Sequence, residues 1–166
     1  MFREMKRSRQ SLPKEEISAV LDRCTNGVMA CLGDEGYPYA VPLNYVYLDG
    51  RIYFHTAKAG HKMDALDRNP KVSFAAVDED TIVSAEYTSY FRSVIAFGRA
   101  RVAEGDERRK AFEVLVEKYS GDRPEEEKRK TIDDCERAHI VAIDVEHITG
   151  KEAAEYADER PGQVEE

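Results

Sequence analysis

The sequence lacks the features of several special classes of protein. No apolar run approaches the roughly 20 residues that a membrane-spanning helix needs. The first ten residues, MFREMKRSRQ, are basic, but no apolar segment follows them, so we expect no secretory signal peptide. We therefore expect no membrane partner and, by default, a cytoplasmic location.

Cysteine is scarce and its spacing is uninformative. Cys24, Cys31 and Cys135 form an odd set without a Cys-x-x-Cys pair or the Cys/His spacing of a zinc site. His139 and His147 lie at the two ends of one predicted strand, about 26 Å apart at about 3.3 Å per residue. We therefore predict no metal site.

Net positive charge is also lacking. The 33 acidic residues outnumber the 25 lysines and arginines, for a formal net charge of −8. This balance argues against nucleic acid as a partner. Residues 152–166 alone hold six acidic side chains and one arginine. We expect residues 1–151 to form a single domain, followed by a solvated, poorly ordered acidic tail at 152–166.

The pattern of apolar residues predicts a mainly β fold with helices at its edges. A helix is expected at about 13–24, and residues 28–56 contain three strands separated by turns at Asp34-Glu35-Gly36 and Asp49-Gly50. Further strands are predicted at 71–78, 87–105 and 139–150, and further helices at 60–67, 106–120 and 124–138. Gly98 interrupts the longest strand and predicts a bend. Hairpin-linked strands with flanking helices favour an antiparallel barrel.

A possible phosphate site lies in the segment GRIYFHTAKAGHKMDALDRNP, residues 50–70. A strand ends there in a glycine surrounded by cations, just where the next helix begins. Unpaired N–H groups and the positive end of the helix dipole favour an anion at such a helix start. Gly60 would let the backbone approach the anion closely, and His61 and Lys62 would add donors and charge. An ordinary solvated loop is the alternative.

A longer pattern resembles a known family. The motifs YPYAVPLNY, DGRIYFHTA, AGHK and NPKVSF, followed by SVIAFGRARV and HITGK, occur in order across residues 14–151. Together they resemble the flavin-binding split-barrel proteins related to pyridoxamine 5′-phosphate oxidase, and most of all their nitroimidazole-resistance (Nim-type) reductase branch. The resemblance implies an antiparallel split β-barrel of the FMN-binding type, with peripheral helices. It also implies a homodimer with FMN at the subunit interface.

The resemblance also implies which residues contact FMN. One strand would lie along the isoalloxazine, a second would form the next wall, and a turn would hold the phosphate. A fourth group would reach the same flavin from the other subunit. The strand along the isoalloxazine contributes Val41, Pro42, Leu43 and Asn44, and the next wall contributes Phe54, His55 and Thr56. The phosphate turn contributes Gly60, His61 and Lys62, and the group from the other subunit contributes Arg92, Ser93 and Val94.

His55 is our candidate for a catalytic residue. Strand alternation places Phe54 and Thr56 on one face and His55 on the other. A strand histidine is commonly structural, but its place beside the implied flavin suggests a proton donor or a substrate-orienting group. The tyrosines Tyr37, Tyr39, Tyr45, Tyr47 and Tyr53 could stack on a ring or serve as sheet residues, and Tyr87 and Tyr90 could cover the flavin.

The sequence favours an FMN-dependent reductase that passes electrons from NAD(P)H to a small acceptor such as a nitroaromatic. No dinucleotide-binding glycine fingerprint is present, so NAD(P)H would dock transiently. The arginine- and histidine-bearing C-terminal segment of true pyridoxamine phosphate oxidases has no counterpart, which argues against vitamin B6 oxidation. The alternatives are a non-catalytic flavin-binding or storage module, and a haem- or deazaflavin-binding relative on the same fold.

Overall fold

The computed structural model describes residues 1–134 and 137–160. The strands are β1 Gly27–Leu32, β2 Pro38–Leu43, β3 Val46–Leu48, β4 Arg51–Ala57, β5 Lys71–Val83, β6 Thr88–Val102 and β7 Ala138–Glu152. The α-helices are α1 Lys14–Arg23, α2 His61–Arg68, α3 Gly105–Ser120, α4 Glu125–Asp133 and α5 Ala154–Glu159. Short 3-10 turns occupy Ser8–Gln10, Asp34–Gly36 and Ser84–Glu86. The predicted mainly β fold with flanking helices is confirmed.

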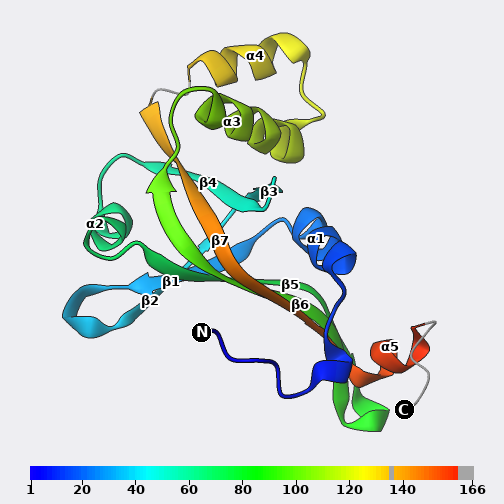
Figure 1. Ribbon diagram of the computed structural model, residues 1–166. Coiled ribbons are helices and arrows are strands. Elements are labelled where there is room, and N and C mark those ends of the chain that lie inside the picture. Colours follow the sequence, from blue (N-terminus) through cyan, green and yellow to red (C-terminus); the bar gives the residue numbers. More distant parts are fainter. Residues whose placement is uncertain (135–136, 161–166) are drawn as a thin grey trace.

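The strands form one antiparallel sheet in the order β2-β1-β5-β6-β7-β4-β3 (Figure 1). Its two edge strands, β2 and β3, follow one another in the chain and are joined only by Asn44 and Tyr45. The sheet therefore turns back on itself, yet β2 and β3 do not pair. The result is an antiparallel barrel that stays open along one seam.

The bend predicted at Gly98 is present. The pairing of β6 with β7 shifts register between Phe97 and Gly98. A Cβ atom at Gly98 would lie 2.3 Å from the carbonyl oxygen of Asp144, so only glycine lets the two strands approach this closely. Beyond this region β5 and β6 continue as a long hairpin, with α5 at the far end (Figure 1).

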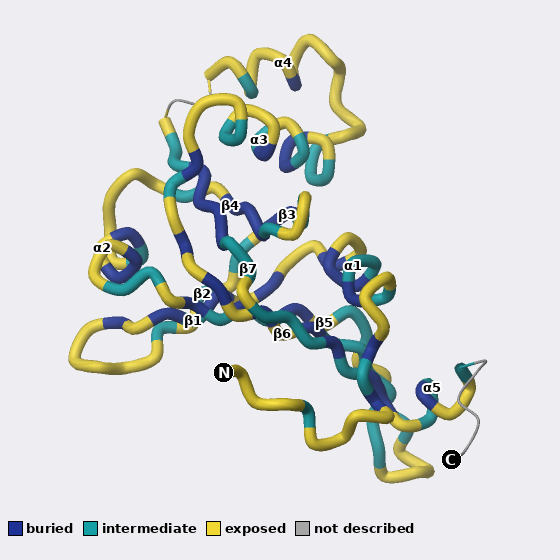
Figure 2. The backbone as a smooth tube through the Cα atoms, viewed as in Figure 1, coloured by how far each residue is buried: buried dark blue, intermediate teal, exposed yellow. Residues whose placement is uncertain are grey.

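Two apolar cores lie on opposite faces of the sheet. The larger fills the barrel and includes Met29, Phe54 and Phe74, with α1 and α2 closing it. The smaller lies between α3 and the outer faces of β3, β4 and β7, and is built around Tyr53 and Leu115. Figure 2 shows the buried stretches of these strands and helices in dark blue.

A buried tyrosine fixes the link between the two edge strands. Tyr45 is fully buried, and its hydroxyl donates to the carbonyl of Leu21 at 2.8 Å, near the end of α1. The Tyr119 hydroxyl of α3 accepts from the backbone N–H of Tyr45 at 2.9 Å. Its proton can go to either of two carbonyls, that of Thr25 at 2.6 Å or that of Tyr45 at 2.8 Å. These bonds tie α1, α3 and the β2–β3 link together.

Lys118 completes the same attachment. Its Nζ donates to the carbonyl of Cys24 at 2.7 Å and lies 3.4 Å from that of Leu21. It also lies over the ring of Tyr45, 4.7 Å from the centroid. A half-buried cation is stabilised here because it satisfies carbonyls left unpaired at the end of α1.

The C-terminal segment differs from the prediction. β7 continues to Glu152, whose side chain is 2 % exposed and forms ion pairs with Arg92 and Arg160. α5 then packs against the N-terminal 3-10 turn. The expectation of a solvated tail is therefore wrong for residues 152–160, because two arginines compensate the buried carboxylate. Residues 161–166 lie outside the described part of the chain.

The predicted helix at 124–138 is shorter than expected. It ends at Asp133, and Ala138 already belongs to β7. Cys135 lies outside the described residues, whereas Cys24 and Cys31 are free and buried. Among the helices that the structure describes, none has the length and apolar character needed to cross a membrane.

Candidate functional site

The open seam exposes backbone on two strands. β3 pairs with β4 only over Arg51–Tyr53, so the stretch of β4 from Phe54 to Ala57 has β7 on one side and no strand on the other. β2 pairs with β1 alone and leaves its second edge free. Backbone N–H and C=O groups at these free edges are available to a ligand.

Strand alternation decides which side chains line the seam. Phe54 is fully buried in the barrel core, Thr56 is half-buried on the same face, and His55 is exposed on the other face. The predicted alternation along this strand is therefore confirmed. On β2, Val41 and Leu43 are half-buried while Pro42 is exposed, and Asn44 is exposed at the start of the link.

Lys62 lies at the mouth of the seam. Its Nζ donates to the Thr56 hydroxyl at 3.3 Å and lies 5.4 Å from the centroid of the Phe54 ring. Partial burial lowers the pKa of Lys62. Among the described residues, no carboxylate lies within ion-pair distance of this ammonium group. A half-buried cation without a counter-charge favours the binding of an anion.

The backbone at the start of α2 supports the same conclusion. Gly60 precedes the helix with φ 126° and ψ 173°, a conformation that a side chain would strain. A Cβ atom built on it would meet nothing within 4 Å, so the space beside it is open. The first N–H groups of α2, at His61 and Lys62, have no partner within the helix and lie at the positive end of its dipole.

The side chain of His61 points away from Lys62. Its ring stacks on Tyr39 with 4.2 Å between centroids, and Nε2 lies 3.5 Å from a carboxylate oxygen of Asp34. Asp34 also pairs with Arg68 at 2.6 Å. His61 can therefore offer an anion its backbone N–H, while its ring connects α2 to the β1–β2 turn. The sequence carried no signal for this contact, because Asp34 appeared only as a turn residue.

The residue types along the seam are those that a ligand with a phosphate at one end and a planar apolar ring at the other would require. The phosphate end requires cationic and N–H donors, which Lys62 and the start of α2 provide. The ring requires an apolar wall edged by free backbone groups, which β2 and β4 provide. Pro42, which has no N–H, leaves this part of the wall without a backbone donor.

Comparison with known proteins identifies the family. The family model described as pyridoxamine 5′-phosphate oxidase matches residues 13–152. The chain belongs to this family. The predicted resemblance and the split-barrel fold are both confirmed. A sequence search of the curated proteins found no match.

Solved structures share the fold of this pyridoxamine 5′-phosphate oxidase family member. The candidate 5-nitroimidazole antibiotic resistance protein of Bacteroides thetaiotaomicron superimposes with a TM-score of 0.70 at 22% identity, over 85% of each chain. Protein Rv2991 of Mycobacterium tuberculosis gives a TM-score of 0.78 at 22% identity, over 98% of each chain. An FAD-binding protein of Mesorhizobium loti gives 0.58 at 25% identity, over 86% of this chain and 96% of its own.

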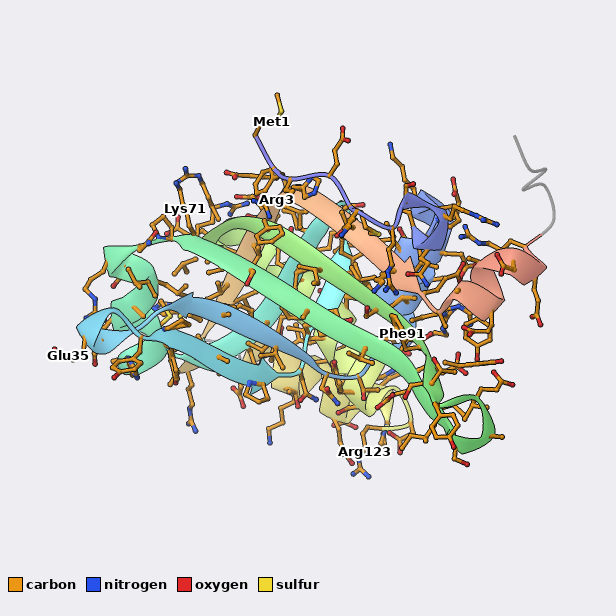
Figure 3. The ribbon with its side chains drawn as sticks, turned by 90° about the horizontal axis from the view of Figure 1, so that it is seen from below. Met1, Arg3, Glu35, Lys71, Phe91 and Arg123 are labelled. Atoms are coloured by element: carbon orange, nitrogen blue, oxygen red, sulfur yellow. The ribbon has the colours of Figure 1, made fainter. Side chains whose placement is uncertain are left out.

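The structure brings two of the four predicted groups of contact residues into direct contact. Residues 54–56 and 60–62 meet through Thr56 and Lys62, residues 41–44 lie at the other edge of the seam, and residues 92–94 lie on the β5–β6 hairpin. Figure 3 shows Glu35 of the β1–β2 turn at one end of the molecule and Phe91 far from it, along the β5–β6 hairpin. Arg92 forms ion pairs with Glu79 and Glu152, both at 3.4 Å. Residues 92–94 therefore cannot reach the seam of their own chain.

A stability experiment can test whether Lys62 is placed for a ligand. We expect Lys62→Met to leave the free energy of unfolding unchanged, or to raise it by up to about 1 kcal/mol, because a desolvated charge is removed. The pKa of Lys62 is lower in the folded state than in the unfolded chain. Wild type should therefore gain stability relative to Lys62→Met as pH rises toward the ordinary lysine value of about 10.4.

Lys118→Met is the matched control, because its pKa is also lowered by burial but its ammonium donates to backbone carbonyls. It should cost about 1–3 kcal/mol, since the carbonyl of Cys24 loses its donor. Urea unfolding of ligand-free protein at several pH values measures both changes. A loss of more than about 1 kcal/mol in Lys62→Met would show that Lys62 is structural.

Proposed function

We propose that this protein binds FMN at the seam and acts as a flavin-dependent reductase. The observation that carries the proposal is Lys62, a half-buried cation at a glycine-capped helix start that has no carboxylate partner within residues 1–134 and 137–160. The relatives support a redox cofactor, because their names record nitroimidazole resistance, FAD binding and joint FAD and haem binding. The chain itself is expected to reduce a small acceptor such as a nitroaromatic.

The residues at the seam would divide the binding between them. The N–H groups of His61 and Lys62, together with the Lys62 ammonium, would hold the phosphate, with Gly60 allowing close approach. The backbone of Val41–Asn44 and of Phe54–Thr56 would contact the ring. Bound flavin would accept hydride from NAD(P)H, and the protein would orient it and exclude water from one side.

An apolar patch supports a homodimer. Six of the outward residues of β1, β5 and β6 carry no charge, and in register they form two rows across the sheet. The rows are Val28, Ala75 and Ile95, and Ala30, Ser73 and Phe97; we call them the outer apolar face. Val28, Ile95 and Phe97 are 37%, 45% and 37% exposed. Uncharged apolar surface on neighbouring strands suits a self-complementary interface with a second copy.

The outer apolar face borders the seam. Pro42 pairs with Val28 in register, so the first row runs directly into the β2 strand that is proposed to contact the flavin. A second subunit placed over this face would cover Pro42. We therefore propose that FMN lies at the subunit interface, where the partner subunit provides the contacts proposed for Arg92 and Ser93. The Val94 side chain is fully buried in the barrel core, so at that position only the backbone can take part.

The first test of this function is flavin binding. Wild type should bind FMN more tightly than riboflavin, which lacks the phosphate. Lys62→Met should weaken FMN binding about tenfold or more and leave riboflavin binding unchanged, because a charge-assisted contact contributes about 1.5–3 kcal/mol. Titrations followed by flavin fluorescence give both constants. Equal FMN affinity in wild type and Lys62→Met would exclude the proposed phosphate site at Lys62.

The same preparations separate the alternative functions. A flavin spectrum with NADH or NADPH oxidation in the presence of a nitroaromatic supports a reductase. Flavin binding without turnover indicates a storage module. A haem or deazaflavin spectrum of the purified protein would show that this group, and not FMN, is the cofactor.

His55 is our proposed proton donor on the exposed face of β4. His55→Ala should lower kcat for acceptor reduction about 100-fold, in line with the loss of a general acid, while the backbone contact of residue 55 keeps FMN affinity within about threefold. His147→Ala is the histidine control, since His147 lies on β7 seven residues beyond Ile140, the register partner of His55, and stacks on Phe2 of the N-terminal segment. Unchanged turnover in His55→Ala would exclude this role.

The dimer can be tested at Ile95, the most exposed residue of the outer apolar face. Ile95→Glu should convert the dimer to a monomer and weaken FMN binding, because a buried carboxylate would lie against the partner subunit. Ile82→Glu adds the same charge at the hairpin end, where Ile82 is 78% exposed, and should change neither property. Size-exclusion chromatography with light scattering measures the mass. A monomeric wild type would contradict the proposed interface.

A further inference from the structure

A second cationic cavity lies at the strand ends beside the Lys62 site. It has a volume of about 290 Å³ and is formed by the end of β4, the end of β6, the start of α3 and the start of β7. Its lining residues are Lys58, Val102, Ala103, Glu104, Arg108, Ala138 and His139. The volume is close to the lower end of the range for small-molecule sites, about 300–1,000 Å³.

The cavity is connected to the Lys62 site by the end of β4. His139 pairs in register with Thr56, and the Thr56 hydroxyl accepts from Lys62. The two residues of a register pair project from the same face of a sheet, so His139 lies on the face that carries the Lys62 contact. Lys58 follows Thr56 by two residues at the start of the turn that leads to Gly60. Lys58 and Lys62 therefore flank the same short turn, Lys58 at the cavity and Lys62 at the seam.

The charge of the lining favours an anion. Lys58 and Arg108 are cationic, His139 can donate a hydrogen bond in either protonation state, and Glu104 provides one carboxylate. Arg108 donates to the carbonyl of Ala138 at 3.3 Å, which holds its guanidinium beside the cavity. Within the described part of the chain, neither the Lys58 nor the His139 side chain has an ion-pair or hydrogen-bond partner. Both remain available to a ligand.

We propose that this cavity binds a second phosphate-bearing group of a nucleotide whose redox ring lies at the seam. The inference rests on the proposed flavin site, which supplies the neighbouring anchor point. Two nucleotides share the required chemistry: a flavin dinucleotide, through its second phosphate, and a reduced nicotinamide dinucleotide, through a phosphate of its adenosine half. Lys58 and Arg108 neutralise the phosphate, and His139 donates a hydrogen bond to it.

The test compares ligands that differ only in the distal group. FMN, FAD and 2′,5′-ADP are titrated into wild type, Lys58→Ala and His139→Ala, with 2′,5′-ADP added to both flavin-free and FMN-loaded protein. Lys71→Ala, an exposed lysine on the other side of α2, is the charge control. Fluorescence measures the flavins, and calorimetry measures 2′,5′-ADP.

The measured affinities show whether the flavin or the nicotinamide nucleotide supplies the second phosphate. If the flavin supplies the phosphate, FAD should bind about tenfold more tightly than FMN, and Lys58→Ala and His139→Ala should abolish this preference without changing FMN affinity. If the nicotinamide nucleotide supplies it, FMN and FAD should bind equally in all variants, and both cavity substitutions should weaken 2′,5′-ADP binding about tenfold. In either case Lys71→Ala should behave as wild type.

Other outcomes overturn the proposal. Unchanged affinity for all three ligands in Lys58→Ala and His139→Ala would show that the cavity binds no nucleotide phosphate. An equal loss of FMN and FAD affinity would assign Lys58 to the first phosphate site instead. If wild type binds neither flavin, the proposed function fails separately, and 2′,5′-ADP binding to the flavin-free protein still decides whether the cavity takes a phosphate.

Discussion

The hydrogen bonds of Tyr45 are the constraint on which the rest of the structure depends. The chain must pass from one edge of the sheet to the other within two residues, and Tyr45 is one of them. Its buried hydroxyl and its backbone N–H are both satisfied by other elements, Leu21 near the end of α1 and Tyr119 of α3. A buried polar group is costly unless it is paired, so this geometry permits only one placement of the link.

Because the β2–β3 link is held in one position, the position of the seam is determined as well. Because Tyr45 is held by α1 and α3, β2 diverges from β4 instead of extending the β3 pairing, and both strands keep a free edge. The free edge of β4 ends at the turn that starts α2, where Lys62 lies over Phe54 without a counter-charge. Lys118 shows the contrast within the same fold. Its half-buried ammonium donates to backbone carbonyls, whereas that of Lys62 donates to the Thr56 hydroxyl and has no ion-pair partner among the described residues.

Much of this arrangement could be predicted from local sequence. The turn residues and the alternation of β4 defined the strands, and Gly98 marked the bend, because each feature depends on neighbouring residues. The role of Glu152 could not be predicted, since its burial depends on Arg92 and Arg160, which are distant in sequence. Likewise His61 was recognised as a phosphate-site residue, but the stacking of its ring on Tyr39 depends on how α2 packs beside β2.

The position of Arg92, Ser93 and Val94 explains why one chain cannot form the whole proposed site. Ser93 precedes Ile95 on the outward side of β6, so it lies at one margin of the outer apolar face, whereas Pro42 lies at the other. In a two-fold symmetric dimer, each surface contacts the same surface of its partner. A two-fold axis through this face would bring Ser93 of each chain toward Pro42 of the other. The proposed interface and the proposed cofactor site therefore depend on the same alternation of residues along β6.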